Sequence, residues 1–256
     1  MTTTVPSSTT DPVAQPAETA ETAGLFSPPL RTVVSYAGGA AMLATPLLIV
    51  GGILTSPPQA SRAMDDYVES LARDPFLSSL SASLLHYGWV TLALGLLVAM
   101  TLVRGSKGRV LTLVGGLVGG FAAVQMSALM LNDYFLTALG NNLALGDAVK
   151  VANAMMVDGD VASQLWWQSG KLVILLPVLL YAGLARAGVI SWWLVPLSAL
   201  PMVLPYLVMG WVGGASDQLI GGNALGLIAG GLTGLVCYAP TFLVGLRLLG
   251  RGRLTA

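Results

Sequence analysis

Six polar side chains stand within or beside long apolar runs, and they are the residues of this sequence best suited to chemistry. They comprise one imidazole, one carboxylate, one amine and three amides: His86, Gln125, Asn132, Asp133, Gln168 and Lys171. A polar group inside an apolar segment is costly unless a partner or water satisfies it. We therefore treat all six as candidates for ligand binding.

Proton transfer and charge pairing are the chemistry that these groups could perform. Histidine can gain or lose a proton near neutral pH, and Asp133 could neutralise the amine of Lys171. Two plainer interpretations stay open. Lys171 could extend its stem toward water, and His86 could be a packing residue.

Other kinds of site find no support in the sequence. It has no phosphate-binding loop, paired-histidine zinc motif or nucleophile elbow. With one histidine and a single cysteine, Cys237, a dedicated metal site is not expected. We predict no cofactor and no set of catalytic residues. The 12 basic and 12 acidic residues are balanced, which argues against a nucleic-acid partner.

The composition indicates a membrane protein. Hydrophobic residues make up 55% of the chain and charged residues 9%, whereas soluble domains carry about 25% charged residues. Apolar runs recur at the length of about 20 residues that crosses a bilayer. Because continuous runs of this kind form helices rather than barrel strands, the lipid bilayer is the expected surrounding and the predicted class is all-α.

Turn residues divide the apolar part of the chain into six predicted spanning helices. These cover residues 33–54, 79–103, 110–135, 165–185, 190–213 and 219–248. Residues 1–30 are rich in Thr, Pro, Ala and Ser, and such a composition favours a disordered tail. The prediction is thus a disordered tail (1–30), a six-helix transmembrane bundle (31–250) and a short second tail (251–256).

The positions of the basic residues predict how the bundle is oriented. Eight of them flank one side of the six-helix threading: Arg31, Arg104, Lys107, Arg109, Arg186, Arg247, Arg251 and Arg253. Only Arg62, Arg73 and Lys150 flank the other side. Since Lys and Arg are enriched on the cytoplasmic side, we predict a multi-pass protein of the cell membrane with both termini in the cytoplasm.

Two loops on the predicted outer side have the pattern of short amphipathic helices. "SRAMDDYVESLARDP" places Met64, Val68 and Leu71 on one helical face. "GDAVKVANAMMVDGD" places Val149, Ala152 and Met156 in a similar way. Each is expected to lie on the outer surface with its apolar face against the bundle or the lipid headgroups.

The six polar candidates fall in one layer of this threading. His86 and the pair Gln168 and Lys171 lie near the outer starts of two helices, and Gln125, Asn132 and Asp133 lie near the outer end of a third. Three helices thus contribute polar groups at a similar depth, where such groups usually face the bundle interior or a water-filled cavity. The pattern predicts an outward-facing polar pocket.

Two passages carry a resemblance to known proteins. With "LVRGSKGRVLTLVGG" and "LLYAGLARAGVISWWLVPL", the chain resembles a loose group of multi-spanning actinobacterial membrane proteins of unknown function. The resemblance covers most of residues 33–250. It implies the same kind of multi-pass architecture but no biochemical role and no catalytic residue.

Small residues and prolines indicate how the helices pack. One glycine face contains Gly222, Gly226, Gly230 and Gly234, and another contains Gly115, Gly116, Gly119 and Gly120. Such faces let helices approach closely, either within the bundle or against a membrane-protein partner or second copy. Pro196, Pro201 and Pro205 predict that the helix at 190–213 is bent or locally unwound.

Three functions remain open. The leading one is a transporter-like protein, or one that binds a small molecule or lipid, without covalent chemistry. The second is a membrane enzyme acting on a lipid or isoprenoid, with Asp133 and His86 as acid–base groups. The third is a structural or accessory subunit of a membrane complex.

Overall fold

The computed structural model describes residues 28–59, 61, 63–172, 176–201, 203–220 and 224–254. Within this part of the chain, regular secondary structure is helical throughout, which confirms the predicted class. Most of the tail that was predicted to be disordered, residues 1–27, lies outside the described residues. Helix α1 (Pro28–Thr55) begins earlier than predicted. Its first two residues are prolines, which are tolerated in the first turn because the missing N–H has no helical partner there.

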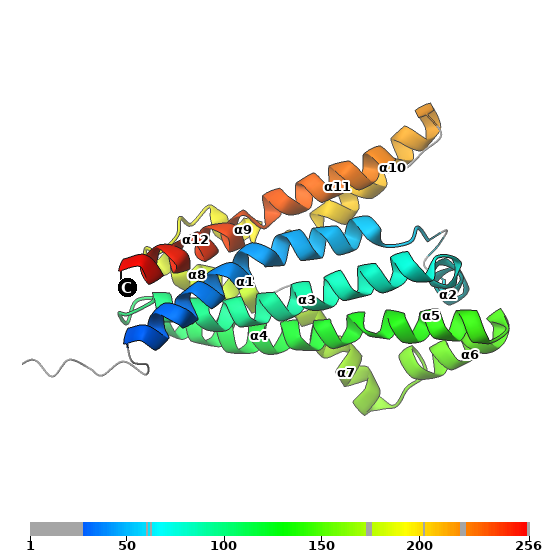
Figure 1. Ribbon diagram of the computed structural model, residues 1–256, viewed down its shortest axis with the longest axis horizontal. Helices are drawn as coiled ribbons and strands as arrows, with labels where there is room; N and C mark the ends of the chain where they lie inside the picture. The colour runs from blue at the N-terminus through cyan, green and yellow to red at the C-terminus, as the bar shows by residue number, and fades with distance from the viewer. Residues whose placement is uncertain are drawn as a thin grey trace, which may run out of the picture.

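Twelve further helices follow α1 in the described residues. They are α2 (Met64–Arg73), α3 (Pro75–Ala99), the 3₁₀ helix η1 (Met100–Leu102), α4 (Arg109–Met130), α5 (Asn132–Asn142), α6 (Leu145–Met156), α7 (Val161–Lys171), α8 (Leu176–Arg186), α9 (Leu194–Leu197), α10 (Leu204–Ile220), α11 (Ala224–Cys237) and α12 (Ala239–Leu254). Together they form an elongated bundle (Figure 1).

Three of these helical stretches are long and apolar enough to cross a membrane: Pro29–Thr55, Pro75–Leu102 and Arg109–Asn142. A fourth crossing results if Leu225–Cys237 and Ala239–Arg251, which are bent by 46° relative to each other, form one span. Helices of this length and composition identify a membrane-embedded protein. Crossing by six helices stays a prediction.

Two of the predicted helices are interrupted near prolines within the described residues. The predicted helix at 190–213 is split into α9 and α10, with Pro201 in the turns between them. This confirms the expected unwinding. The predicted helix at 165–185 corresponds to α7 and α8, and residues 173–175 between them lie outside the described residues. Helices α11 and α12 meet at Tyr238, just before Pro240.

Helices α1 and α3 pack closely because small residues alternate across their contact. A Cβ added at Gly88 would lie 2.6 Å from Cγ1 of Ile49, and one at Gly52 would lie 2.6 Å from Cγ of Leu85. The hydroxyl of Ser81 donates to the carbonyl oxygen of Gly52 at 2.8 Å. Close approach and an interhelical hydrogen bond replace the hydrophobic driving force that is missing in lipid.

The predicted glycine faces are occupied by helices of the same chain. Gly230 and Gly234 of α11 pack against Pro205 of α10, and Gly234 also faces Val50 of α1. Gly226 is buried, and Gly222 lies outside the described residues. Docking of a partner or a second copy on these faces stays a prediction.

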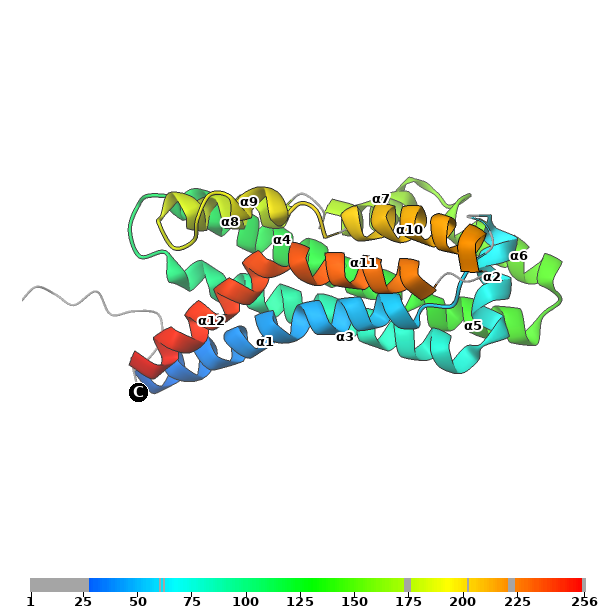
Figure 2. The ribbon, with the colours of Figure 1, turned by 90° about the horizontal axis from the view of Figure 1, so that it is seen from above.

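The two predicted amphipathic helices are present as α2 and α6, and they pack on each other and on α5. Val68, Leu71, Leu136, Ala148 and Ala152 form the small core between them. We call α2, α5 and α6 the cap. It lies at one end of the molecule, away from the C-terminus (Figures 1 and 2).

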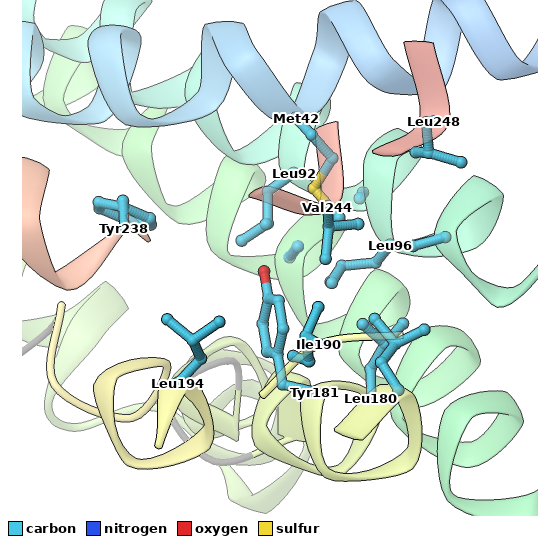
Figure 3. Packing of buried hydrophobic residues seen from close by; sticks show 14 of the residues in the cluster. Met42, Leu92, Leu96, Leu180, Tyr181, Ile190, Leu194, Tyr238, Val244 and Leu248 are labelled. Carbon is cyan, nitrogen blue, oxygen red and sulfur yellow. The ribbon is translucent and has the colours of Figure 1, made fainter. Parts of the chain in front are cut away.

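The main core lies between the cap and the opposite end, and it is built from side chains of α1, α3, α4, α8, α9 and α12. Tyr181 rises from α8 into this cluster, near Leu194 and Ile190 (Figure 3). Its hydroxyl shares a 2.7 Å hydrogen bond with Oγ1 of Thr241, which joins α8 to α12.

Charges separate along the long axis. The end that holds the start of α1, the η1–α4 loop and the ends of α8 and α12 (Figure 2) carries Arg31, Arg104, Lys107, Arg109, Arg186 and Arg251, and we call it the basic end. The cap end carries Asp65, Asp66, Glu69 and Asp147 together with Arg73 and Lys150. Both described ion pairs, Glu69–Arg73 and Asp147–Lys150, lie in the cap.

Candidate functional site

His86 is held by a buried serine on the neighbouring helix. Its Nδ1 shares a hydrogen bond of 2.7 Å with Oγ of Ser127 on α4 and lies 3.3 Å from the backbone oxygen of the same residue. The ring meets Tyr87 edge-on, with 4.9 Å between centroids. Because Ser127 presents a hydroxyl and a carbonyl, Nδ1 finds a partner whether it accepts or donates a proton.

A second polar contact lies one turn away along α3. Ser83 and Tyr134 share a hydrogen bond between their hydroxyl groups, which joins α3 to α5. Ser83 and His86 are three residues apart on α3, and Ser127 and Tyr134 are seven apart, so each pair shares a helix face. We call Ser83, His86, Ser127 and Tyr134 the polar seam. Tyr134 is 38% exposed, so the seam reaches the molecular surface.

Asp133 lies on the face of α5 that contacts α2, where Tyr67 is its hydrogen-bond partner. The Tyr67 hydroxyl donates to Oδ1 of Asp133. Burial raises the pKa of Tyr67, and the neighbouring carboxylate raises it further, so the phenol stays protonated. The contact fastens α2 to α5. Among the described residues, no ion pair joins Asp133 to Lys171.

Asn132 and Asp133 do not end a helix as the sequence suggested, because α5 continues to Asn142. Leu136 is fully buried against α2 and α6, and this packing extends the helix beyond the expected stop. The side-chain amide of Asn132 donates to Sδ of Met156 at 3.2 Å. Both residues therefore join α5 to the other two helices of the cap.

Gln125 and Lys171 lie on the opposite side of α4 from His86. Gly170 packs against backbone atoms of Gln125 and Met126, which places α7 on that face. At 100° per residue, Ser127 is turned by roughly 160° from Gln125. His86 and the end of α7 thus flank different faces of α4.

Lys171 and Gln168 are exposed on α7, and Lys171 is its last residue. The common depth of the candidates stays a prediction, and around α4 they lie on different faces. The structure joins His86 to Ser127 and Asp133 to Tyr67, and it does not bring His86 together with Lys171.

The polar seam is suited to hydrogen bonding rather than to covalent chemistry. A serine nucleophile must reach its substrate, whereas Ser127 is only 3% exposed. Within the described part of the chain, Nε2 of His86 has no hydrogen-bond partner and can serve a bound molecule. The described residues contain no group of three or more His, Cys, Asp or Glu side chains placed to hold a metal ion.

Four residues of the site were not predicted from the sequence: Ser83, Ser127, Tyr134 and Tyr67. A pattern in the sequence could have identified two of them. The seven-residue spacing that relates Gln125 to Asn132 also relates Ser127 to Tyr134. Tyr67 gave no comparable signal, because it lies in the cap and its partner is distant in sequence.

Comparison of the chain with protein-family models, with curated proteins and with solved structures finds no match.

Proposed function

We propose that the chain is a multi-pass membrane protein that binds an amphiphilic small molecule or lipid at the polar seam, without covalent chemistry. The observation that carries the proposal is the hydrogen-bonded His86, whose second ring nitrogen is left for a ligand. A polar headgroup would bind there, at the level of Ser83 and Tyr134.

The apolar surface beside the seam supports an amphiphile rather than a wholly polar ligand. Val124 is 53% exposed on α4, three residues before Ser127, and Leu94 is 53% exposed on α3, two turns beyond Tyr87. Both lie farther from the cap than the seam does, because α3 runs away from the cap and α4 runs toward it. The tail of the ligand would lie over these side chains while its headgroup contacts the seam.

Loss of the ligand from a His86 variant tests the proposal. We expect His86→Ala to reduce the amount of a co-purifying amphiphile about tenfold, because one hydrogen bond to a ligand contributes about 1.4 kcal/mol. The protein would be purified in native-membrane discs and its extracted small molecules compared by mass spectrometry. Ser127→Ala should reduce binding in the same direction.

Ser169→Ala is the matched control, since Ser169 bonds only within its own helix α7. If the His86→Ala variant retained the same amount of the co-purifying amphiphile, the polar seam would be rejected as the binding site. A chemically altered molecule, released in the absence of a gradient, would instead favour the enzyme alternative.

We also propose six crossings, with α4–α5, α7–α8, α9–α10 and α11–α12 each forming one, and both termini in the cytoplasm. The separated charges support this orientation, because the basic end fits the cytoplasmic side. Interrupted spanning helices are tolerated where neighbouring helices or water satisfy the freed backbone groups.

Single cysteines introduced after Cys237→Ala test this topology. In intact cells, Gly146→Cys in the cap should react with a membrane-impermeant maleimide, since an added Cβ meets nothing within 4 Å there. Ser106→Cys and Ser191→Cys, both exposed at the basic end, should react only after permeabilisation. Reaction of Ser191→Cys in intact cells would rule out a crossing by α7–α8.

A further inference from the structure

A hollow opens at the basic end, far from the polar seam. It has a volume of about 340 Å³ and is lined by Ser106, Lys107, Gly108, Val110, Leu111 and Arg186. This volume lies within the range of about 300–1,000 Å³ that small-molecule sites occupy. Its walls come from the loop before α4, the first turn of α4 and the last residue of α8.

Backbone docking makes the floor of the hollow rigid. Gly108 has φ +77°, and a Cβ there would lie 2.1 Å from the carbonyl oxygen of Gly183. Only glycine fits this position. The backbone N–H and the hydroxyl of Thr112 both donate to the Gly108 oxygen at 2.9 Å. Lys107 precedes Gly108, and Arg186 follows Gly183 by three residues, so this backbone contact brings both cations to the hollow.

Within the described residues, no ion pair joins Lys107 or Arg186 to a carboxylate. Lys107 and Arg186 are exposed, and the described ion pairs are both in the cap. At the same end, partial burial lowers the pKa of Arg251, and the positive charges of Arg104 and Arg31 lower it further. An anion entering the hollow would meet a positive surface.

An apolar stripe leads away from the hollow along α4. Val110, which lines the hollow, is 72% exposed, and Leu117 and Phe121 continue the same helix face at 55% and 58%. From Val110 to Phe121 the stripe runs for roughly 16 Å at 1.5 Å per residue. That is about half of a hydrocarbon core of roughly 30 Å, the depth of one leaflet.

We propose that this hollow binds the headgroup of an anionic phospholipid, with one acyl chain along the stripe on α4. Lys107 and Arg186 would hold the phosphodiester oxygens through charge-assisted hydrogen bonds. Basic pockets between transmembrane helices on the cytoplasmic side bind anionic headgroups in this way. The apolar stripe favours a lipid over free phosphate, which would leave it unused. The proposal does not depend on the polar seam.

Lipid titration of the full-length protein tests the proposal. The protein is heated in neutral detergent with a thiol-reactive dye, and unfolding is followed as the buried Cys237 becomes accessible to the dye. Phosphatidylglycerol should raise the unfolding midpoint in a saturable manner, and phosphatidylcholine and inorganic phosphate should not. Lys107→Gln combined with Arg186→Gln should weaken phosphatidylglycerol binding about 30-fold, since each cation near the surface contributes a factor of about five.

Two further double variants separate binding from folding. Lys107→Arg with Arg186→Lys keeps both charges and should keep the affinity. Arg73→Gln with Lys150→Gln removes two charges in the cap and should leave the affinity unchanged. Equal protection by phosphatidylcholine, or unchanged affinity in the glutamine variant, would overturn the proposal. Protection by inorganic phosphate at comparable concentration would assign the hollow to a soluble anion instead.

Discussion

Gly115→Ala is expected to lower the free energy of unfolding by more than about 3 kcal/mol. Gly115 lies where α4 crosses α8, and a Cβ there would come within 2.1 Å of the backbone nitrogen of Leu180. The obstacle is backbone, so no side chain can rotate away, and the two helices must separate. Gly183→Ala should act in the same way, because its Cβ would meet the backbone nitrogen of Thr112 at 2.5 Å.

Gly210→Ala is the matched control for both variants. Gly210 is in α10, and an added Cβ meets nothing within 4 Å. In a helix, alanine is more favourable than glycine by up to about 1 kcal/mol. The unfolding midpoint, followed by exposure of Cys237, should therefore fall sharply for Gly115→Ala and stay level or rise for Gly210→Ala. Equal midpoints would show that α4 and α8 do not pack this closely.

The helical class and the membrane setting could be predicted because they follow from composition and local pattern. Long apolar runs predicted the three described stretches that are long and apolar enough to cross a membrane, and the amphipathic pattern predicted α2 and α6. The acids after these two helices also have a local role. Asp74 and Asp160 cap the next helices by accepting the backbone N–H of Leu77 and Ser163.

Helix continuity was predicted less well, because local signals compete with packing. The stretch before Asn142 looked like a turn in the sequence, yet α5 continues through it because Leu136 and Leu139 pack in the cap. In contrast, the apolar run at 190–213 was expected to be one helix, and it is divided into α9 and α10 by turns that contain Pro201. Hydropathy indicates which segments are apolar enough for the membrane, but it does not indicate where a helix is interrupted within such a segment.

The predicted pocket illustrates what a sequence leaves undetermined in a helical bundle. Depth along a helix follows from residue count, so the sequence predicts a similar depth for His86, Gln125 and Lys171. The direction around the bundle depends on which helix packs on which face. Contact with Gly170 turns Gln125 toward α7, while Ser127 faces α3. No pattern in one sequence specifies this choice.

Tyr67→Phe is expected to loosen the cap while the spanning helices stay folded. The Tyr67 hydroxyl is the partner of the Asp133 carboxylate, and a hydrogen bond to a charged group contributes about 1.5–3 kcal/mol. Asp133→Ala should cost a similar amount, because it leaves a buried phenol without an acceptor. The double variant should cost less than the sum by about 1.5–3 kcal/mol, since either change alone already removes the contact. Hydrogen exchange of the backbone amides in α2 and α6 measures these free energies in the full chain.

Tyr87→Phe provides the matched control on α3. Tyr87 is 59% exposed, and its hydroxyl has no hydrogen-bond partner within the described residues, so amide exchange in the cap should not change. Additive costs for Tyr67→Phe and Asp133→Ala would show that the two side chains are not coupled.

The midpoint for Cys237 exposure adds a second distinction. If it fell together with cap protection, the cap and the bundle would unfold as one cooperative unit. A constant midpoint would mean that the cap can open without unfolding α3 and α4, the two helices that carry His86 and Ser127.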